Sequence, residues 1–102
     1  MSMITMNIIV IVILIGGIFN MTKLEQKLLE LGYEYINNSR WVKDYDGNKN
    51  IFINTNENHN KIKDYYIHFY SFVECQQDIN DLQQAFNQLQ NDLKELKQVE
   101  NE

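Results

Sequence analysis

The segment with the strongest strand character is Lys61-Ile62-Lys63-Asp64-Tyr65-Tyr66-Ile67-His68-Phe69-Tyr70-Ser71-Phe72-Val73. β-branched and aromatic side chains dominate it, and such side chains pack well on a pleated surface. The segment is apolar on both of its faces, which is typical of a strand covered on two sides. It therefore predicts a strand in a central position of a sheet.

Side chains of a strand alternate between its two faces, so this segment divides into two sets. One face carries Tyr65, Ile67, Phe69 and Val73, and the other carries Tyr66, His68, Tyr70 and Phe72. The first set is the better candidate for the core. The second set favours a partly wet strand face, because tyrosine buries a ring while its hydroxyl stays in water. Its alternative role is an aromatic contact surface for a partner, formed by Tyr66, His68 and Tyr70.

Two further strands are predicted upstream of this segment. Residues 40–45 and 49–54 have strand character, and Asp46-Gly47 between them is typical of a tight turn with positive φ at both central positions. Residues 33–36 and the polar corner of residues 37–39 lead into the first of these strands, and the polar residues 55–60 lead into the aromatic segment. The simplest arrangement is a three-stranded antiparallel meander.

A short helix is predicted before the sheet. Thr22 and Glu25 have the spacing of a capping box, in which each side chain binds a backbone N–H of the other residue. Leu24, Leu28 and Leu31 share one helical face, and Gly32 supplies a left-handed residue that ends the helix. The helix is short and amphipathic, so its stability depends on packing.

A long helix is predicted after the sheet, from about Gln77 to Val99. Its apolar positions recur at steps of three and four residues, namely Ile79, Leu82, Phe86, Leu89, Leu93 and Leu96. This stripe has two interpretations: it covers the sheet, or it forms a short coiled-coil seam with a second copy or another protein. Because the helix is longer than a small sheet is wide, its later turns around Leu93, Leu96 and Val99 are expected to overhang.

The first twenty residues form an apolar leader, with an unbroken apolar run from Ile8 to Phe19. The run is shorter than the roughly 20 apolar residues that span a bilayer, and no Lys or Arg precedes Lys23. Translation from Met21 is the favoured interpretation, since Gly16-Gly17 is compatible with a ribosome-binding site just upstream. The alternative is a membrane anchor of residues 4–20, with the domain of residues 21–102 in the cytoplasm.

Composition favours one small cytoplasmic domain. The 102 residues include 14 acidic and nine basic side chains, for a net charge of −5. That charge repels a phosphate backbone, so nucleic-acid binding is disfavoured. Cys75 is the single cysteine, which excludes an intrachain disulfide and suits a reducing compartment.

No residue pattern predicts catalysis, a cofactor or a metal. Asp44, Asp46 and Asn48 have the spacing of a calcium loop, but Lys49 and Thr55 occupy the positions that need glycine and glutamate. His59, His68 and Cys75 lack the paired spacing of a zinc site or an oriented nucleophile. They are read as a solvated histidine, a strand-face histidine and a buried free cysteine. The acids of the terminal helix are read as its solvated face.

Two segments, residues 24–34 (LEQKLLELGYE) and 77–93 (QDINDLQQAFNQLQNDL), resemble small uncharacterised proteins encoded by bacteriophages and prophages of low-GC Gram-positive bacteria. The resemblance implies a cytoplasmic, non-enzymatic accessory role and supplies no catalytic residues. The expected protein is an α+β domain of short helix, three-stranded sheet and long helix that acts by protein–protein contact. The expected contact residues are Tyr66, His68, Tyr70, Leu93 and Leu96.

Overall fold

The computed structural model describes residues 21–102. The interpretations of residues 1–20, as a leader, a membrane anchor or a segment upstream of the true start, lie outside the described residues. Among the helices that are described, none is both long enough and apolar enough to cross a membrane.

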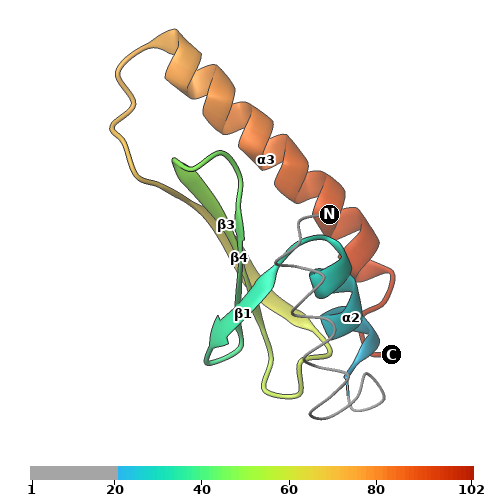
Figure 1. The fold of residues 1–102 in the computed structure, drawn as a ribbon. Coiled ribbons are helices and arrows are strands. Elements are labelled where there is room, and N and C mark those ends of the chain that lie inside the picture. Colours follow the sequence, from blue (N-terminus) through green and yellow to red (C-terminus); the bar gives the residue numbers. More distant parts are fainter. Residues whose placement is uncertain (1–20) are drawn as a thin grey trace.

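The described chain has an α+β fold in which two helices and a four-stranded antiparallel sheet share one core (Figure 1). The elements are α2 (Lys23–Glu30), β1 (Glu34–Asn37), β2 (Arg40–Asp44), β3 (Lys49–Thr55), β4 (Ile62–Phe69) and α3 (Gln76–Lys97). The order of strands in the sheet is β1-β2-β3-β4, so each strand pairs with its neighbours in sequence. The α+β class is confirmed, whereas the expected number of three strands is wrong.

The additional strand is β1, in a segment whose residue pattern predicts no strand. It pairs with β2 through Glu34 opposite Val42 and Tyr35 opposite Trp41. Asn38 and Ser39 join the two strands with φ of 49° and 64°, so this polar corner is a two-residue hairpin with positive φ at both positions. All four residues of β1 are exposed, and for that reason no alternation of apolar and polar residues marks it as a strand.

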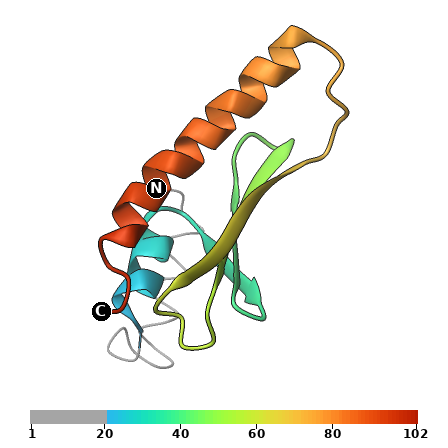
Figure 2. The ribbon, with the colours of Figure 1, turned by 180° about the vertical axis from the view of Figure 1, so that it is seen from behind.

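The central strand with the most buried face is β3, not the aromatic segment. Side chains of β3 alternate regularly between buried and half-buried, with Ile51 and Ile53 fully buried. β4 pairs with β3 along one side only among the described residues and forms the edge of the sheet (Figure 2). The prediction that the aromatic segment is central is therefore wrong. Its second face, with Tyr66, His68 and Tyr70, is exposed because the described helices pack on the other face of the sheet.

The turn between β2 and β3 is also looser than predicted. Residues 45–48 form a four-residue loop, which Tyr45 closes by donating its backbone N–H to the Lys49 carbonyl at 2.9 Å. Gly47 has φ of +82°, but the φ of Asp46 is not positive. The loop is therefore not the predicted tight turn with positive φ at both central positions. The Asp44 carboxylate accepts the Gly47 N–H at 3.0 Å, and this side-chain bond supports the wider loop.

The capping box at the start of α2 is confirmed. The Thr22 hydroxyl accepts the Glu25 N–H at 3.0 Å, and the Glu25 carboxylate accepts the Thr22 N–H at 3.0 Å. Gly32, with φ of +96°, ends the helix as predicted. Leu24 and Leu28 are fully buried on the inner face of α2, where they join the core.

The core lies where α2 and the C-terminal half of α3 meet one face of the sheet. It contains Leu24, Leu28, Leu29, Tyr33, Trp41, Ile51, Ile53, Leu89, Leu93 and Leu96. Leu93 and Leu96 are 2% and 0% exposed, so the expectation that the later turns of α3 overhang is wrong. The overhanging half is the N-terminal one, where Ile79 and Phe86 are 49% and 45% exposed. Figure 1 shows this end of α3 leaning away from the sheet.

Candidate functional site: an apolar groove between β4 and α3

A groove of about 390 Å³ lies between the edge strand and the overhanging half of α3. Its walls are Tyr65, Tyr66 and Ile67 from β4, and Ile79, Leu82, Gln83, Phe86 and Leu89 from α3. Apart from Gln83 and Tyr66, whose side chain stacks on Phe52 on the other face of the sheet, the lining residues present apolar or aromatic side chains. The groove exists because α3 is anchored to the core only through its C-terminal half, so its N-terminal turns stand off the sheet.

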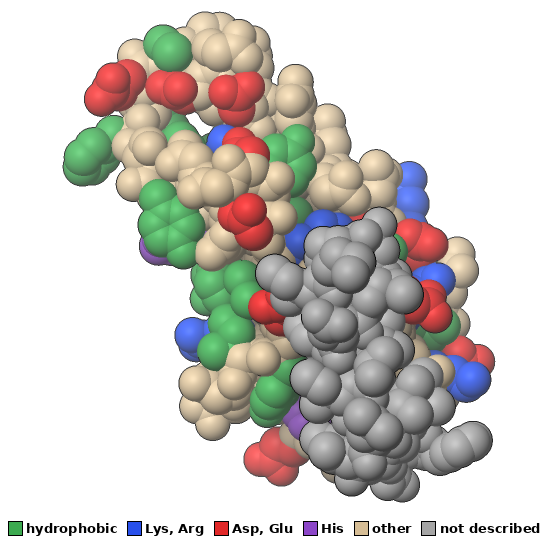
Figure 3. Space-filling model, viewed as in Figure 1, with side chains coloured by type: hydrophobic (Ala, Val, Ile, Leu, Met, Phe, Trp, Pro, Cys, Tyr) green, Lys and Arg blue, Asp and Glu red, His purple; other side chains and the backbone are tan. Residues whose placement is uncertain are grey.

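Exposed apolar side chains gather around this groove. Of the nine large hydrophobic residues exposed among residues 21–102, seven lie on β4, on the segment that follows it or on the first half of α3: Tyr65, Tyr66, Tyr70, Phe72, Val73, Ile79 and Phe86. Phe72, in the linker before α3, is 87% exposed. Figure 3 shows hydrophobic side chains along this side of the molecule, together with acidic ones near the start of α3. Such a concentration of exposed apolar side chains is typical of interaction surfaces.

The alternation predicted for the aromatic segment is confirmed within β4, whereas Phe72 and Val73, which were assigned to its two faces, lie in the linker beyond the strand and are exposed. Tyr65 and Ile67 lie opposite Ile53 and Ile51 of β3, on the face that α3 covers. Tyr66, His68 and Tyr70 lie on the opposite, open face, where all three are exposed. That they contact a partner stays a prediction, whereas Leu93 and Leu96 are buried in the core and offer no exposed flank.

The aromatic side chains of the open face pack on one another. Tyr66 stacks on Phe52 with ring centroids 4.8 Å apart and planes inclined by 11°. His68 and Tyr70 meet edge to face at 4.3 Å, and the Tyr70 hydroxyl is hydrogen bonded to the Asn50 amide at 2.8 Å. These contacts order the outer side chains of β4, which therefore present a pre-arranged surface.

A buried charge holds α3 to the rest of the molecule. The Asp92 carboxylate accepts hydrogen bonds from the Tyr33 hydroxyl and the Lys43 ammonium, both at 2.8 Å. Lys43 also donates to the Leu31 carbonyl at 2.9 Å, and Gln88 donates to the second Asp92 oxygen at 2.9 Å. Asp92 is 2% exposed, so the interpretation of every acid on this helix as solvated is wrong for Asp92.

Burial, followed by the nearby Asp92 charge, raises the pKa of the Tyr33 hydroxyl far above its usual value. The phenol is therefore neutral at ordinary pH and serves as a donor to the carboxylate. Every polar group in this cluster is paired with another protein group, as a buried ion pair requires. The cluster joins the turn after α2 to β2 and α3, and its role is structural.

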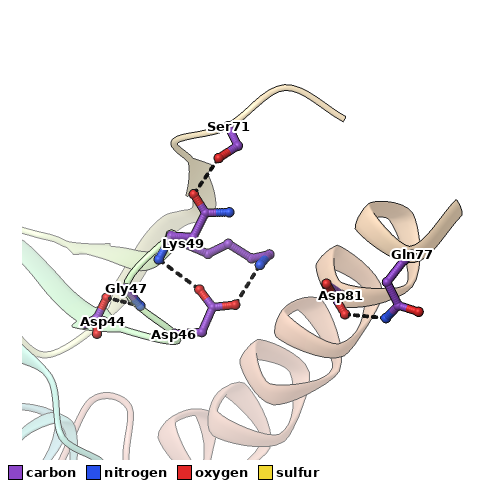
Figure 4. Close-up of polar contacts among 8 residues, drawn as sticks. Asp44, Asp46, Gly47, Lys49, Ser71, Gln77 and Asp81 are labelled. Atoms are coloured by element: carbon purple, nitrogen blue, oxygen red, sulfur yellow. Dashed lines mark hydrogen bonds and ion pairs between the residues drawn. The ribbon is translucent and has the colours of Figure 1, made fainter. Parts of the chain in front are cut away.

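A second buried charge, the Lys49 ammonium, lies beneath the linker and the first half of α3 (Figure 4). The Lys49 ammonium binds the Asp46 carboxylate at 2.7 Å and lies 5.2 Å from the centre of the Phe69 ring. The hydrogen bond from Lys49, together with backbone N–H groups, holds the pKa of Asp46 below its usual range. Lys49 was expected on a strand, but nothing in the sequence indicates that its ammonium is buried.

The residues considered for metal binding are placed apart. Asp44 and Asp46 of the calcium-like spacing bind backbone N–H groups of their own loop. His59 contacts Thr55 at 3.1 Å, His68 is on the open face of β4, and Cys75 is exposed at the start of α3 rather than buried as predicted. Within residues 21–102, no three His, Cys, Asp or Glu side chains are grouped as metal ligands.

A second hollow, of about 450 Å³, lies at the other end of the molecule between α2 and β1. Its lining includes Met21, Tyr35, Trp41 and His59. All the residues that line the groove between β4 and α3 belong to the fold described above, and this groove is the site developed below.

Comparison with protein-family models, with curated proteins and with solved structures finds no match for this chain. The function is therefore argued from the groove and the surfaces beside it.

Proposed function

We propose that this chain is a non-enzymatic accessory protein of a bacteriophage or prophage, and that it acts by binding another polypeptide through the groove between β4 and α3. The phage origin rests on the resemblance of residues 24–34 and 77–93. The mode of action rests on the exposed hydrophobic residues that line the groove, Tyr65, Ile79 and Phe86, and on the further exposed hydrophobic residues of β4 and the linker beside it.

The shape of the groove suits a polypeptide more than a small molecule. Its walls carry few hydrogen-bonding groups, whereas small-molecule sites usually combine an apolar lining with several convergent polar groups. On one side the groove borders a strand edge, and on the other an amphipathic helical face. Both are surfaces on which partner strands or helices commonly dock.

The experiment compares two isoleucines of similar exposure at opposite ends of the molecule. Ile79→Asp places a charge in the groove, and Ile36→Asp places the same charge on β1, where the native side chain is 46% exposed. We expect Ile79→Asp to reduce capture of the binding partner from host cells at least tenfold, and Ile36→Asp to leave it unchanged. If both variants capture as much partner as the unaltered chain, the groove is not the binding site and the proposal is wrong on that point.

The location follows from the same proposal. A cytoplasmic location is proposed for the domain, and the alternative is a membrane tether formed by residues 4–20. The Ile8–Phe19 run favours the alternative, because it is continuously apolar. Fractionation of cells that express the native gene with a C-terminal tag distinguishes the two: the proposal expects the tagged protein in the soluble fraction, and recovery in the membrane fraction would contradict it.

A further inference from the structure

We propose that the occupant of this surface is a second copy of the chain, whose β4 pairs antiparallel with β4 of the first copy about a two-fold axis at Tyr66. The inference deepens the proposed function, because it names the partner of the same surface.

Within residues 21–102 no strand pairs with the outer edge of β4, so its backbone groups are available for pairing. Tyr70 donates its N–H to the Asn48 carbonyl at 3.0 Å, which fixes the hydrogen-bonding phase between β3 and β4. Along two antiparallel strands, residues that are hydrogen bonded to the neighbouring strand alternate with residues that are not. Tyr70 is bonded to β3, so the N–H and C=O groups of Tyr65, Ile67 and Phe69 point away from β3. At the start of the strand, the Ile62 N–H is already bound by Glu100 at 2.8 Å. The free part of the edge is therefore its middle and its end.

This phase restricts the register of a symmetric pair. Hydrogen-bonded pairs must join outward-pointing residues, and an axis at Tyr66 places Tyr65 of one copy opposite Ile67 of the other. The same register uses the greatest length of the free edge, because Tyr66 lies near the middle of β4. Two such pairs, related by the axis, form four hydrogen bonds across the joined edges.

The side chains in this register are complementary. Asp64 of one copy faces His68 of the other, and an imidazole N–H donates well to a carboxylate. The two Tyr66 side chains meet at the axis, each already ordered by its stacking on Phe52. On the other face of the sheet, Tyr65 and Ile67 of the two copies lie next to each other. An unrelated strand has no reason to present this charge pattern, so the self-complementarity favours a second copy.

The overhanging half of α3 lies beside the same edge. A two-fold axis perpendicular to the sheet keeps both α3 helices on one side of a continuous sheet. The exposed Ile79 and Phe86 side chains line the groove above β4, so the joined edges bring the two grooves together. Pairing therefore covers both the strand edge and the apolar walls. An uncovered edge of this kind is otherwise prone to unspecific association.

Cysteine cross-linking of the full chain tests the axis directly. In a Cys75→Ser background, Tyr66→Cys places two thiols in a non-hydrogen-bonded pair with Cα atoms about 4.5 Å apart, which a disulfide spans. His68→Cys is the matched control on the same face. Its symmetry mate is displaced by four residues, or about 13 Å along the strand, which is too far for a disulfide.

We expect mild oxidation to convert most of the Tyr66→Cys protein to a species of twice the 12.2 kDa chain mass, and to leave the His68→Cys protein monomeric. Absence of a cross-link at residue 66, or equal cross-linking at both positions, would overturn the proposed pairing.

A charge exchange tests the register without a disulfide. His68→Glu places like charges opposite each other twice in the dimer, so we expect the dissociation constant in sedimentation to rise about tenfold. Adding Asp64→Lys places opposite charges in each pair and should recover most of the lost affinity. Failure of the double variant to recover affinity would exclude this register. Should no dimer form while capture of a host partner still depends on Ile79, this inference is wrong and the proposed function stands.

Discussion

The two halves of α3 carry the same apolar stripe but have opposite environments. Leu89, Leu93 and Leu96 are buried against α2 and the sheet, whereas Ile79 and Phe86 are about half exposed. A helix of 22 residues is about 33 Å long, while the eight residues of β4 span about 26 Å. The stripe identifies the inner face of the helix, and the length and inclination of the helix decide how much of that face is covered.

The sharpest test of this difference is truncation of one side chain in each half. Leu93→Ala removes a fully enclosed side chain and should lower the free energy of unfolding by about 3 to 5 kcal/mol. Ile79→Ala removes a half-exposed side chain, and its cost should be below about 1 kcal/mol. Urea unfolding followed by circular dichroism measures both. Equal costs for the two substitutions would show that the N-terminal half is also part of the core.

The second test concerns the buried charge in the C-terminal half. Asp92→Ala leaves Lys43 and Tyr33 without their shared acceptor and should cost about 3 kcal/mol in unfolding experiments. Glu95→Ala, three residues further along the helix, removes a carboxylate that is half exposed and lies 3.7 Å from Lys27. Its cost should stay below about 1 kcal/mol. A small loss for Asp92→Ala would mean that water replaces the carboxylate and that the cluster does not hold α3.

The third test uses pH. Because the pKa of Tyr33 is raised in the folded state, its contribution to stability is complete below the unfolded pKa of about 10 and is lost as the pH rises above that value. The free energy of unfolding should therefore fall by an additional ~1.4 kcal/mol per pH unit above pH ~10. In Tyr33→Phe this additional slope should disappear. Identical slopes for the two proteins between pH 10 and 11 would contradict the burial of the hydroxyl.

The smallest expected effects concern the capping residues at the starts of α2 and α3. Thr22→Ala removes the capping box of a helix that is packed in the core and should cost about 1 kcal/mol. At the start of α3, the Asp78 carboxylate accepts the backbone N–H groups of Glu74 and Cys75 at 2.9 and 3.2 Å. Asp78→Ala should leave global stability almost unchanged, because the first turns of α3 can fray while the core stays closed. Hydrogen exchange should show faster exchange confined to those turns.

The sequence was most informative where local chemistry determines local structure. Thr22 with Glu25 predicted the start of α2, Gly32 its end, and the period of three and four residues predicted α3 within two residues at each end. Alternation in the aromatic segment correctly assigned Tyr65 and Ile67 to the covered face. Each of these features depends on neighbours in sequence.

The errors concern properties that depend on distant parts of the chain. β1 has no buried side chain, so only its pairing with β2 reveals it. The edge position of β4 depends on the order of strands, which its composition does not encode. Asp92 is buried because Tyr33 and Lys43 are brought to it by the fold. For the same reason Leu93 and Leu96 are unsuitable probes of a partner surface, since lysine at either position would disrupt the core.

The dependence of the core on the C-terminal half of α3 has a consequence for biosynthesis. The sheet is a meander of sequential neighbours, so its hairpins form from segments that leave the ribosome one after another. Leu89, Leu93 and Leu96, which close the core, are made after all four strands. Until the C-terminal half of α3 has left the ribosome, the apolar face of the nascent sheet lacks this cover and is exposed to chaperones. Emergence of that half-helix is the event that allows the domain to close.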